Sequence, residues 1–220
     1  NTLLEMIVDQ ARNFTYADAG TLYIIEDNTL HFKIVQNDSL KIRLGGGAET
    51  IPFAPIELIE SNVSAYVALK GVSVNIPDVY DTNLFDFTGP KKFDNSTGYR
   101  SQSMLVVPMR NHENDVIGVL QLLNATNPLS KEVVSFSQDY ENLCESLASQ
   151  AAVSITNAKL IANMTELFEA FVKVMATAID EKSPVTGGHI RRVADLTLTL
   201  ADVIHHTKEG PYKDITFSPD

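Results

Sequence analysis

The sequence predicts an α/β (α+β) fold in which an antiparallel sheet is flanked by helices. Apolar residues recur at helical spacing near the start of the chain, in residues 3–11. Two pairs of strands follow, each pair joined by a polar turn, at residues 21–25 and 30–35 and at residues 104–109 and 116–123. From Ser135 onward the helical spacing returns over a long stretch. Strands joined by short turns pair antiparallel, which predicts the sheet.

Composition limits the classes of partner. The chain has 220 residues, 44% of them hydrophobic, which suits one domain with an appendage. Its net charge of −11 argues against nucleic acid and against acidic membrane surfaces, because phosphate groups attract basic proteins. We interpret the acidity as a solubility feature. A small anionic ligand stays possible, because backbone amides at a helix N-terminus can bind phosphate.

The cysteine count and the hydropathy indicate a cytoplasmic protein. Cys144 is the single cysteine, so an intramolecular disulfide is excluded, and its apolar helical setting predicts a packing role. No run of apolar residues is long enough to span a membrane, and we expect no membrane contact from this segment. Because the chain opens on Asn1 within a helical pattern and stops at Asp220, we expect a piece of a longer protein.

A dense polar stretch at residues 93–103 leads into the apolar strand at 104–109. Its short hydroxyl and carboxylate side chains favour turns, so it is expected to be a loop. Such a loop at the mouth of a buried strand could hold a small polar ligand, or it could be an ordinary surface turn. The preceding loop, residues 82–92, carries Phe85 and Phe87 as two expected exposed aromatics and is a candidate lid.

Three blocks of sequence resemble the GAF domains of mammalian cyclic-nucleotide phosphodiesterases and cyanobacterial adenylyl cyclases. The first is the Asp-x-x-Thr-Gly-Tyr-x-Ser pattern that begins at Asp94. The others are Asn-Ile-Pro-Asp-Val-Tyr from Asn75 and Val-Ile-Gly-Val from Val116, the latter preceding Asn124. The resemblance implies a GAF-type sandwich with an antiparallel sheet of about six strands, occupying residues 1–160 with its terminal helices.

The resemblance also implies a ligand site. The family's nucleotide-contact positions fall here on Thr21, Asn37, Val63, Ser64, Asp94, Thr97, Ser101 and Gln121. In such a site the helix start at Val63 and Ser64 would hold a cyclic phosphate. Asp94 would accept hydrogen bonds from base or ribose, and Gln121 could donate and accept. The partner implied is a small molecule, with a cyclic nucleotide as one candidate.

The chain departs from the nucleotide-binding members at one motif. Those members carry Asn-Lys, Phe and Asp-Glu, whose Lys and Asp pair to close the lid. Asn124, Phe136 and Glu141 agree with this motif, but Ala125 and Tyr140 replace both charged partners. Three alternatives follow: a lid closed by packing, a cavity for a different ligand, or a ligand-free dimerisation module.

A seam of residues spaced alternately by four and three runs along the C-terminal helical region. Its members are Leu147, Ala151, Ser154, Ala158, Ile161, Thr165, Phe168, Val172, Met175 and Ile179. This period of 3.5 residues is typical of a left-handed coiled coil and predicts a parallel homodimer. The alternative is one amphipathic helix that packs on its own domain.

The last segment resembles the opening of an HD-GYP domain, a metal-dependent phosphodiesterase of cyclic-di-GMP. The matching residues are Thr186, His189, Arg192 and Val193. Residues 161–220 would then be a linker helix and the first part of that domain. The HD pair is missing, Val185 stands where some members have Glu, and His205 and His206 have no carboxylate at ligand spacing. We therefore expect no catalytic and no metal residue here, with a divalent metal only in a complete HD-GYP domain.

Together these features predict a sensory module of a bacterial signalling protein. Ligand occupancy would shift the helix packing and thereby control a downstream phosphodiesterase, whereas this segment would itself be inactive. An independent enzyme is disfavoured because no nucleophile or metal cluster is visible in the sequence. A bilin or haem sensor is disfavoured because Cys144 lies on the C-terminal helix.

Overall fold

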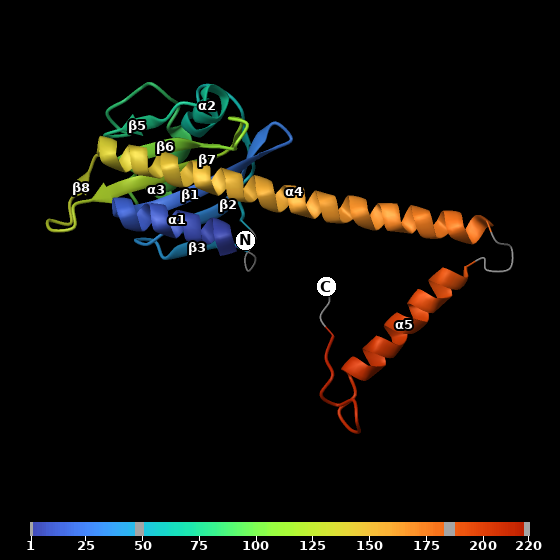
Figure 1. The fold of residues 1–220 in the computed structure, drawn as a ribbon. Helices are drawn as coiled ribbons and strands as arrows, with labels where there is room; N and C mark the ends of the chain where they lie inside the picture. Colours follow the sequence, from blue (N-terminus) through green and yellow to red (C-terminus); the bar gives the residue numbers. More distant parts are fainter. Residues whose placement is uncertain (1, 47–50, 183–187, 218–220) are drawn as a thin grey trace. The chain divides into compact units, whose positions relative to one another are not determined.

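The computed structural model describes residues 2–46, 51–182 and 188–217, and the chain divides into two compact units (Figure 1). The first unit is Asn1–Ala158 and contains every strand that is described. The second unit is Lys159–Asp220 and contains the distal part of one long helix and a second helix.

An antiparallel sheet forms the centre of the first unit, with six strands in the order β3-β2-β1-β7-β6-β5. Their bounds are β1 Ala17–Glu26, β2 Thr29–Asn37, β3 Ile42–Gly45, β5 Val74–Ile76, β6 Met104–Arg110 and β7 Val116–Thr126. Two short strands lie beside this path: β4 Ile56–Glu57 pairs with β2, and β8 Val133–Val134 pairs with β7. Every strand pairing described is antiparallel.

Helices α1 Thr2–Thr15 and α4 Gln138–Lys182 pack on one face of this sheet (Figure 1). Small residues let the two helices approach the strands closely. Val8 and Ala11 of α1 and Cys144, Ala148, Ala151 and Ala152 of α4 form one buried core with strand residues that include Leu22, Leu105, Leu120 and Leu122.

The opposite face of the sheet is covered by α2 Val63–Lys70 and by the segment around α3 Thr88–Thr97. A second core lies here, in which α2 residues Val63, Ala65, Val67 and Ala68 pack with Tyr23, Leu30, Met104, Val106 and Val119. Helices on both faces of an antiparallel sheet confirm the predicted α+β fold class and the long C-terminal helix.

The first strand is longer than the sequence predicts. It begins at Ala17, four residues before the predicted start at Thr21, and runs through Gly20. A Cβ at position 20 would lie 2.7 Å from Val8 Cγ1 and 2.9 Å from Arg12 Cδ. The glycine is therefore explained by the close packing of α1 on β1, and it does not end the strand.

The polar stretch expected to be a loop is in part helical. Helix α3 extends to Thr97 and ends at Gly98, whose φ of 74° places it in the left-handed region. Pro90 lies in the first turn, where a missing N–H is tolerated. The expectation of a loop was wrong because Ser96 and Thr97 turn their hydroxyls onto the carbonyl oxygen of Phe93, within the helix.

One further boundary differs from the predictions. The C-terminal helix, expected from Ser135, begins at Gln138 because β8 and a short connection precede it.

The coiled-coil seam has two different environments along α4. Its first two residues pack against the core of their own domain: Ala151 is 3% exposed, and Leu147 lies at the edge of the same cluster. From Ser154 to Met175 the seam residues are exposed, including Ile161, Phe168 and Val172. The intramolecular alternative therefore holds for the start of the seam.

The second unit also contains α5, which spans His189–His205 and begins after Gly188. Its described apolar side chains are exposed, among them Val193, Leu196 and Leu200. None of the described helices combines the length and the hydropathy that a membrane crossing requires.

Candidate functional site

A cavity of about 440 Å³ lies between the sheet and the layer formed by α2 and the α3 segment. Strands β1, β2 and β7 form its floor, the start of α2 forms one wall, and residues from Asp86 to Phe93 contribute another. This volume is within the range of small-molecule sites, and most of the lining is apolar with a few convergent polar groups.

Polar side chains on the floor come from neighbouring strands. Thr21 on β1 lies directly opposite Gln121 on β7 in the strand register. The hydroxyl of Tyr23 donates a hydrogen bond to Oε1 of Gln121 at 2.8 Å, which orients the amide. Burial raises the pKa of Tyr23 far above its usual value, and hydrogen bonds with Ser64 and Thr21 offset only part of this shift. Tyr23 is therefore an uncharged phenol near neutral pH.

The wall made by α2 begins with a capped helix N-terminus. Asn62 is the N-cap, and its Oδ1 accepts hydrogen bonds from the backbone N–H groups of Ser64 and Ala65, at 3.0 and 3.1 Å. Val63 and Ser64 are both buried at the cavity wall, at 5% and 2% exposure. An Asn at this position satisfies donors that would otherwise be left without partners.

At another part of the lining, Tyr99 is held by two hydrogen bonds. Its hydroxyl donates to Oδ2 of Asp18 at 2.8 Å and accepts from Nδ2 of Asn124 at 2.9 Å. Burial, followed by the hydrogen bond to Asp18, raises the pKa of Tyr99 far above its usual value. Asn37 also lines the cavity, and its Oδ1 accepts from the backbone N–H of Leu40.

The segment expected to be an exposed lid is packed onto the domain. Phe87 is only 3% exposed and lines the cavity. The ring centroid of Phe85 lies 5.2 Å from that of Tyr66 on α2 and 6.3 Å from that of Phe87. The expectation of two exposed aromatics was wrong, because both rings contribute to the core around α2.

Six of the eight ligand positions implied by the resemblance line this cavity: Thr21, Asn37, Val63, Ser64, Ser101 and Gln121. Asp94 and Thr97 do not line it. The buried Asp94 carboxylate accepts hydrogen bonds from the Tyr80 hydroxyl and from both the N–H and the hydroxyl of Ser101. Asp94 therefore holds the chain that follows α3, and Thr97 is bonded to the carbonyl oxygen of Phe93.

Several lining residues were not among the ligand positions predicted from the sequence. They include the aromatic residues Tyr23, Phe32, Phe53, Phe87, Phe93 and Tyr99, together with the polar Gln36, Asn62 and Asp86. Tyr23 could have been found, because it lies two positions after Thr21 and alternate residues of a strand share a face. Phe53 and Asp86 lie outside regular elements, where no period predicts orientation.

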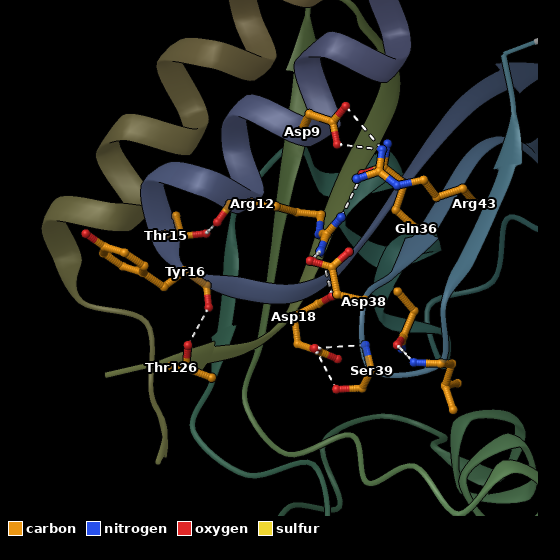
Figure 2. A network of polar contacts seen from close by, with 12 residues as sticks. Asp9, Arg12, Thr15, Tyr16, Asp18, Gln36, Asp38, Ser39, Arg43 and Thr126 are labelled. Carbon is orange, nitrogen blue, oxygen red and sulfur yellow. Dashed lines mark hydrogen bonds and ion pairs between the residues drawn. The ribbon is translucent and has the colours of Figure 1, made fainter. Parts of the chain in front are cut away.

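A network of polar contacts connects the cavity lining to α1, on the other face of the sheet (Figure 2). Nη1 of Arg12 donates to Oε1 of Gln36, a lining residue, at 2.9 Å. Nη2 of Arg12 donates to the carbonyl oxygen of Asp18 at 2.9 Å and forms an ion pair with Asp38. Arg12 is 5% exposed, so its guanidinium is held in place at the end of β2.

The nucleotide-binding motif is kept only in part, and its first two positions lie at the end of β7. Asn124 adopts a φ of 56°, accepts from the N–H of Gln102 and donates to the carbonyl oxygen of Arg100. Ala125, which stands where the family's lysine would be, is fully buried in the core on the α1 and α4 face. Tyr140 packs against the same core.

The residues that resemble an HD-GYP opening are described only in part. Val185 and Thr186 lie outside the described residues, and His189 begins α5. The expectation that His206 has no carboxylate neighbour was wrong, because its Nδ1 lies 3.2 Å from Oδ1 of Asp202, one helical turn earlier. Within the described part of the chain, no three His, Cys, Asp or Glu side chains are grouped as metal ligands would be.

Comparisons with known proteins agree with this architecture. The chain is 30% identical over 177 residues to the dual 3',5'-cyclic-AMP and -GMP phosphodiesterase 11A of Takifugu rubripes, an alignment that covers 76% of this chain and 18% of that protein. It is 27% identical over 170 residues to the corresponding phosphodiesterase 11 of Drosophila melanogaster, covering 72% of this chain and 11% of that protein. The chain thus spans less than a fifth of the length of these relatives.

Solved structures show the same fold at low identity. The GAF domain of an Acinetobacter phosphoenolpyruvate-protein phosphotransferase superposes with a TM-score of 0.52 at 18% identity, covering 73% of this chain and 84% of that one. A GAF domain/HD domain protein from Geobacter sulfurreducens gives a TM-score of 0.53 at 15% identity, with 72% and 93% covered. A sequence profile of the GAF domain matches residues 1–155. Since this match covers more than half of the chain, the protein belongs to the GAF domain family.

Proposed function

We propose that this GAF domain is a sensory module, in which a small ligand in the cavity controls a downstream domain through α4. The cavity of about 440 Å³ carries this proposal, because polar side chains from β1, β7 and α2 converge on it. Six of the positions implied by the family's nucleotide site contribute to its lining. A cyclic nucleotide is the first ligand class to test, since two relatives are named as phosphodiesterases of cyclic AMP and cyclic GMP.

The output of the module would be α4. Residues Cys144, Ala148 and Ala152 of this helix are fully buried against the face of the sheet opposite the cavity, and the same helix continues to Lys182. A ligand can shift the position of α4 only if it binds two arrangements of the domain with different affinities. The downstream domain would be an HD-GYP phosphodiesterase of cyclic-di-GMP in the parent protein, with this segment having a regulatory role.

A homodimer through α4 would transmit the signal between two copies. Exposed apolar side chains from Ile161 to Met175 support this part of the proposal, because water-exposed apolar stripes of this period usually pack against a second helix. The same surface favours the second candidate function, a ligand-free GAF dimerisation module. The two functions differ only in whether the cavity is used.

A thermal-shift and calorimetric screen tests the proposed function. The compounds are cyclic GMP, cyclic AMP and cyclic-di-GMP, with the corresponding nucleosides and bases. A ligand present at 100 times its dissociation constant stabilises the folded state by about 2.7 kcal/mol, which raises the melting temperature by several degrees. We expect at least one compound to produce such a shift.

Ala19→Leu provides the specificity control, because Ala19 lines the cavity and is 4% exposed, so a larger side chain there occupies ligand space. Ala54→Leu is its matched control at an exposed position that does not line the cavity. The shift should disappear in Ala19→Leu and persist in Ala54→Leu. If no compound shifts the wild-type protein, the ligand-free dimerisation module replaces the sensory proposal.

A further inference from the structure

We propose that the cavity selects an uncharged, flat heterocycle of nucleobase to nucleoside size in preference to a charged nucleotide. This inference rests on the proposed function, because it names the ligand class of the same cavity. It follows from three features of the described residues: the charges around the cavity, the hydrogen bonds at the start of α2, and the aromatic walls.

The described part of the lining supplies no positive charge. Among its described residues there is no lysine, arginine or histidine, and Asp86 is the single carboxylate. Asp86 is exposed, and hydrogen bonds from Thr88 hold its pKa below the usual value, so it is an anion at the cavity rim. Tyr23 and Tyr99 stay neutral because burial raises their pKa values. A phosphate that left water for this cavity would find no counter-charge.

The start of α2 offers fewer free donors than an anion site requires. Backbone amides at a helix N-terminus can replace a cation only when they point to the ligand unpartnered. Here the N–H groups of Ser64 and Ala65 are taken by Oδ1 of Asn62, and the N–H of Tyr66 bonds to the carbonyl oxygen of Asn62. An anion would have to displace the Asn62 side chain first.

An organic cation would meet a single lining carboxylate among the described residues, Asp86, and that one is exposed at the rim. The buried carboxylate of Asp94, which follows the lining residue Phe93, already accepts hydrogen bonds from Tyr80 and Ser101. Asp18 is likewise occupied by Ser39 and Tyr99. Since the described wall residues offer neither a cation nor a buried carboxylate without partners, the desolvation cost is smallest for a ligand without formal charge.

The shape and chemistry of the walls favour a ring system. The ring centroid of Phe32 lies 4.7 Å from that of Tyr23 and 5.3 Å from that of Phe53. Phe87, Phe93 and Tyr99 also line the cavity. Aromatic faces stack well on flat ligands. At the floor, Nε2 of Gln121 has Met104 Sδ as a partner at 3.4 Å, a weak acceptor, so this amide can donate to a ring nitrogen or carbonyl oxygen.

Paired ligands that differ only in charge test this inference. Guanosine and adenosine are titrated by calorimetry into the whole chain beside their 3',5'-cyclic monophosphates, which keep the same base and ribose. We expect at least one nucleoside to bind about tenfold or more tightly than its cyclic monophosphate, a difference of one decade in the dissociation constant. Equal or tighter binding of the cyclic monophosphates would overturn the inference.

A variant at the N-cap of α2 tests whether the occupied N–H groups cause the preference for an uncharged ligand. Asn62→Gly frees the N–H groups of Ser64 and Ala65, and glycine is well tolerated at an N-cap. The preference for the nucleoside should fall by about threefold or more in this variant, since each freed amide favours the phosphate. Asn111→Gly is the matched control, because Oδ1 of Asn111 accepts from two backbone N–H groups in a hairpin turn that does not line the cavity. Asn111→Gly should leave the ratio of the two dissociation constants, for nucleoside and for cyclic monophosphate, unchanged.

The outcomes keep the two proposals apart. If nucleobases, nucleosides and cyclic monophosphates all fail to bind, the inference fails, whereas the proposed function stands if cyclic-di-GMP stabilises the wild type but not Ala19→Leu. If the cyclic monophosphates bind and Ala19→Leu abolishes that binding, the sensory function stands and the preference for an uncharged ligand is wrong.

Discussion

Arg12 on α1 donates a hydrogen bond from Nη1 to Oε1 of Gln36, 2.9 Å away, so a helix on one face of the sheet contacts a residue that lines the cavity on the other. Gly20 allows this contact, because a Cβ on that residue would lie only 2.9 Å from Arg12 Cδ. The pair therefore connects the packing of α1 to the position of the β2 end of the cavity.

Arg12→Met should destabilise the protein by about 2–3 kcal/mol, because it leaves the buried Gln36 side chain and the Asp18 carbonyl oxygen without their donor. Urea unfolding measures this loss. Arg43→Met is the matched control: Arg43 is 60% exposed in its ion pair with Asp9, and its loss should cost less than about 1 kcal/mol. Equal losses in the two variants would contradict a structural role for Arg12.

The two residues should also be coupled energetically. In a double-mutant cycle with Arg12→Met and Gln36→Leu, the interaction free energy should be about 1–2 kcal/mol, since the donor is charged and both partners are buried. An interaction free energy near zero would show that the contact contributes nothing to stability.

Tyr99→Phe removes the hydroxyl that bonds to Asp18 and Asn124 and should cost about 1–2 kcal/mol of folding free energy. Because Tyr99 lines the cavity, the same change should also weaken any ligand that the wild type binds. Tyr212→Phe is a suitable control at an exposed position, 55% accessible, and should alter neither stability nor binding. Urea unfolding curves of the two variants measure the change in stability, and calorimetric titration measures the change in ligand affinity.

Cys144 should be unreactive in the folded protein. Burial, with smaller contributions from Glu141 and Glu145, raises the pKa of its thiol to about 12. At pH 8 the thiolate fraction, and with it the iodoacetamide labelling rate, should be lower by roughly three orders of magnitude than in urea-unfolded chains. Labelling at the rate of the unfolded chain would show that the start of α4 detaches from the sheet.

The raised thiol pKa also fixes the direction of a pH effect. The folded state holds the thiol proton of Cys144 more tightly than the unfolded state does. The contribution of this proton to the free energy of unfolding is therefore complete below the unfolded pKa near 9. It is lost as the pH rises toward about 12. Cys144→Ala should therefore reduce the loss of stability over that alkaline range, as followed by unfolding at several pH values.

The exposed seam of α4 predicts self-association. Phe168→Glu places a charge on the seam, where the wild-type side chain is 66% exposed, and should convert a dimer into a monomer in light scattering after gel filtration. Thr177→Glu adds the same charge outside the seam and should leave the dimer intact. A wild-type chain that is monomeric at high micromolar concentration would refute the coiled-coil proposal.

Local sequence patterns were sufficient for the fold class and for the main strands and helices, but not for α3, which was expected to be a loop. Alternation in β1, β2, β6 and β7 and helical spacing in α1 and α4 are short-range signals, and a chain with these periods has few ways to bury its apolar faces. Family-specific blocks around Asp94, Asn75 and Val116 then implied a ligand site, and six of its eight positions line the cavity.

Only the tertiary structure decided which side chains reach that cavity. Asp94 and Thr97 were expected at the ligand. Asp94 instead accepts a hydrogen bond from the N–H of Ser101, and Thr97 donates one to the carbonyl oxygen of Phe93. Tyr23 and Tyr99 line the cavity in their place. These outcomes depend on how segments far apart in the chain pack together, and a one-dimensional period carries no information about that packing. The sequence alone therefore determined the sheet and its helices, whereas the charge and shape of the cavity came from the assembled fold.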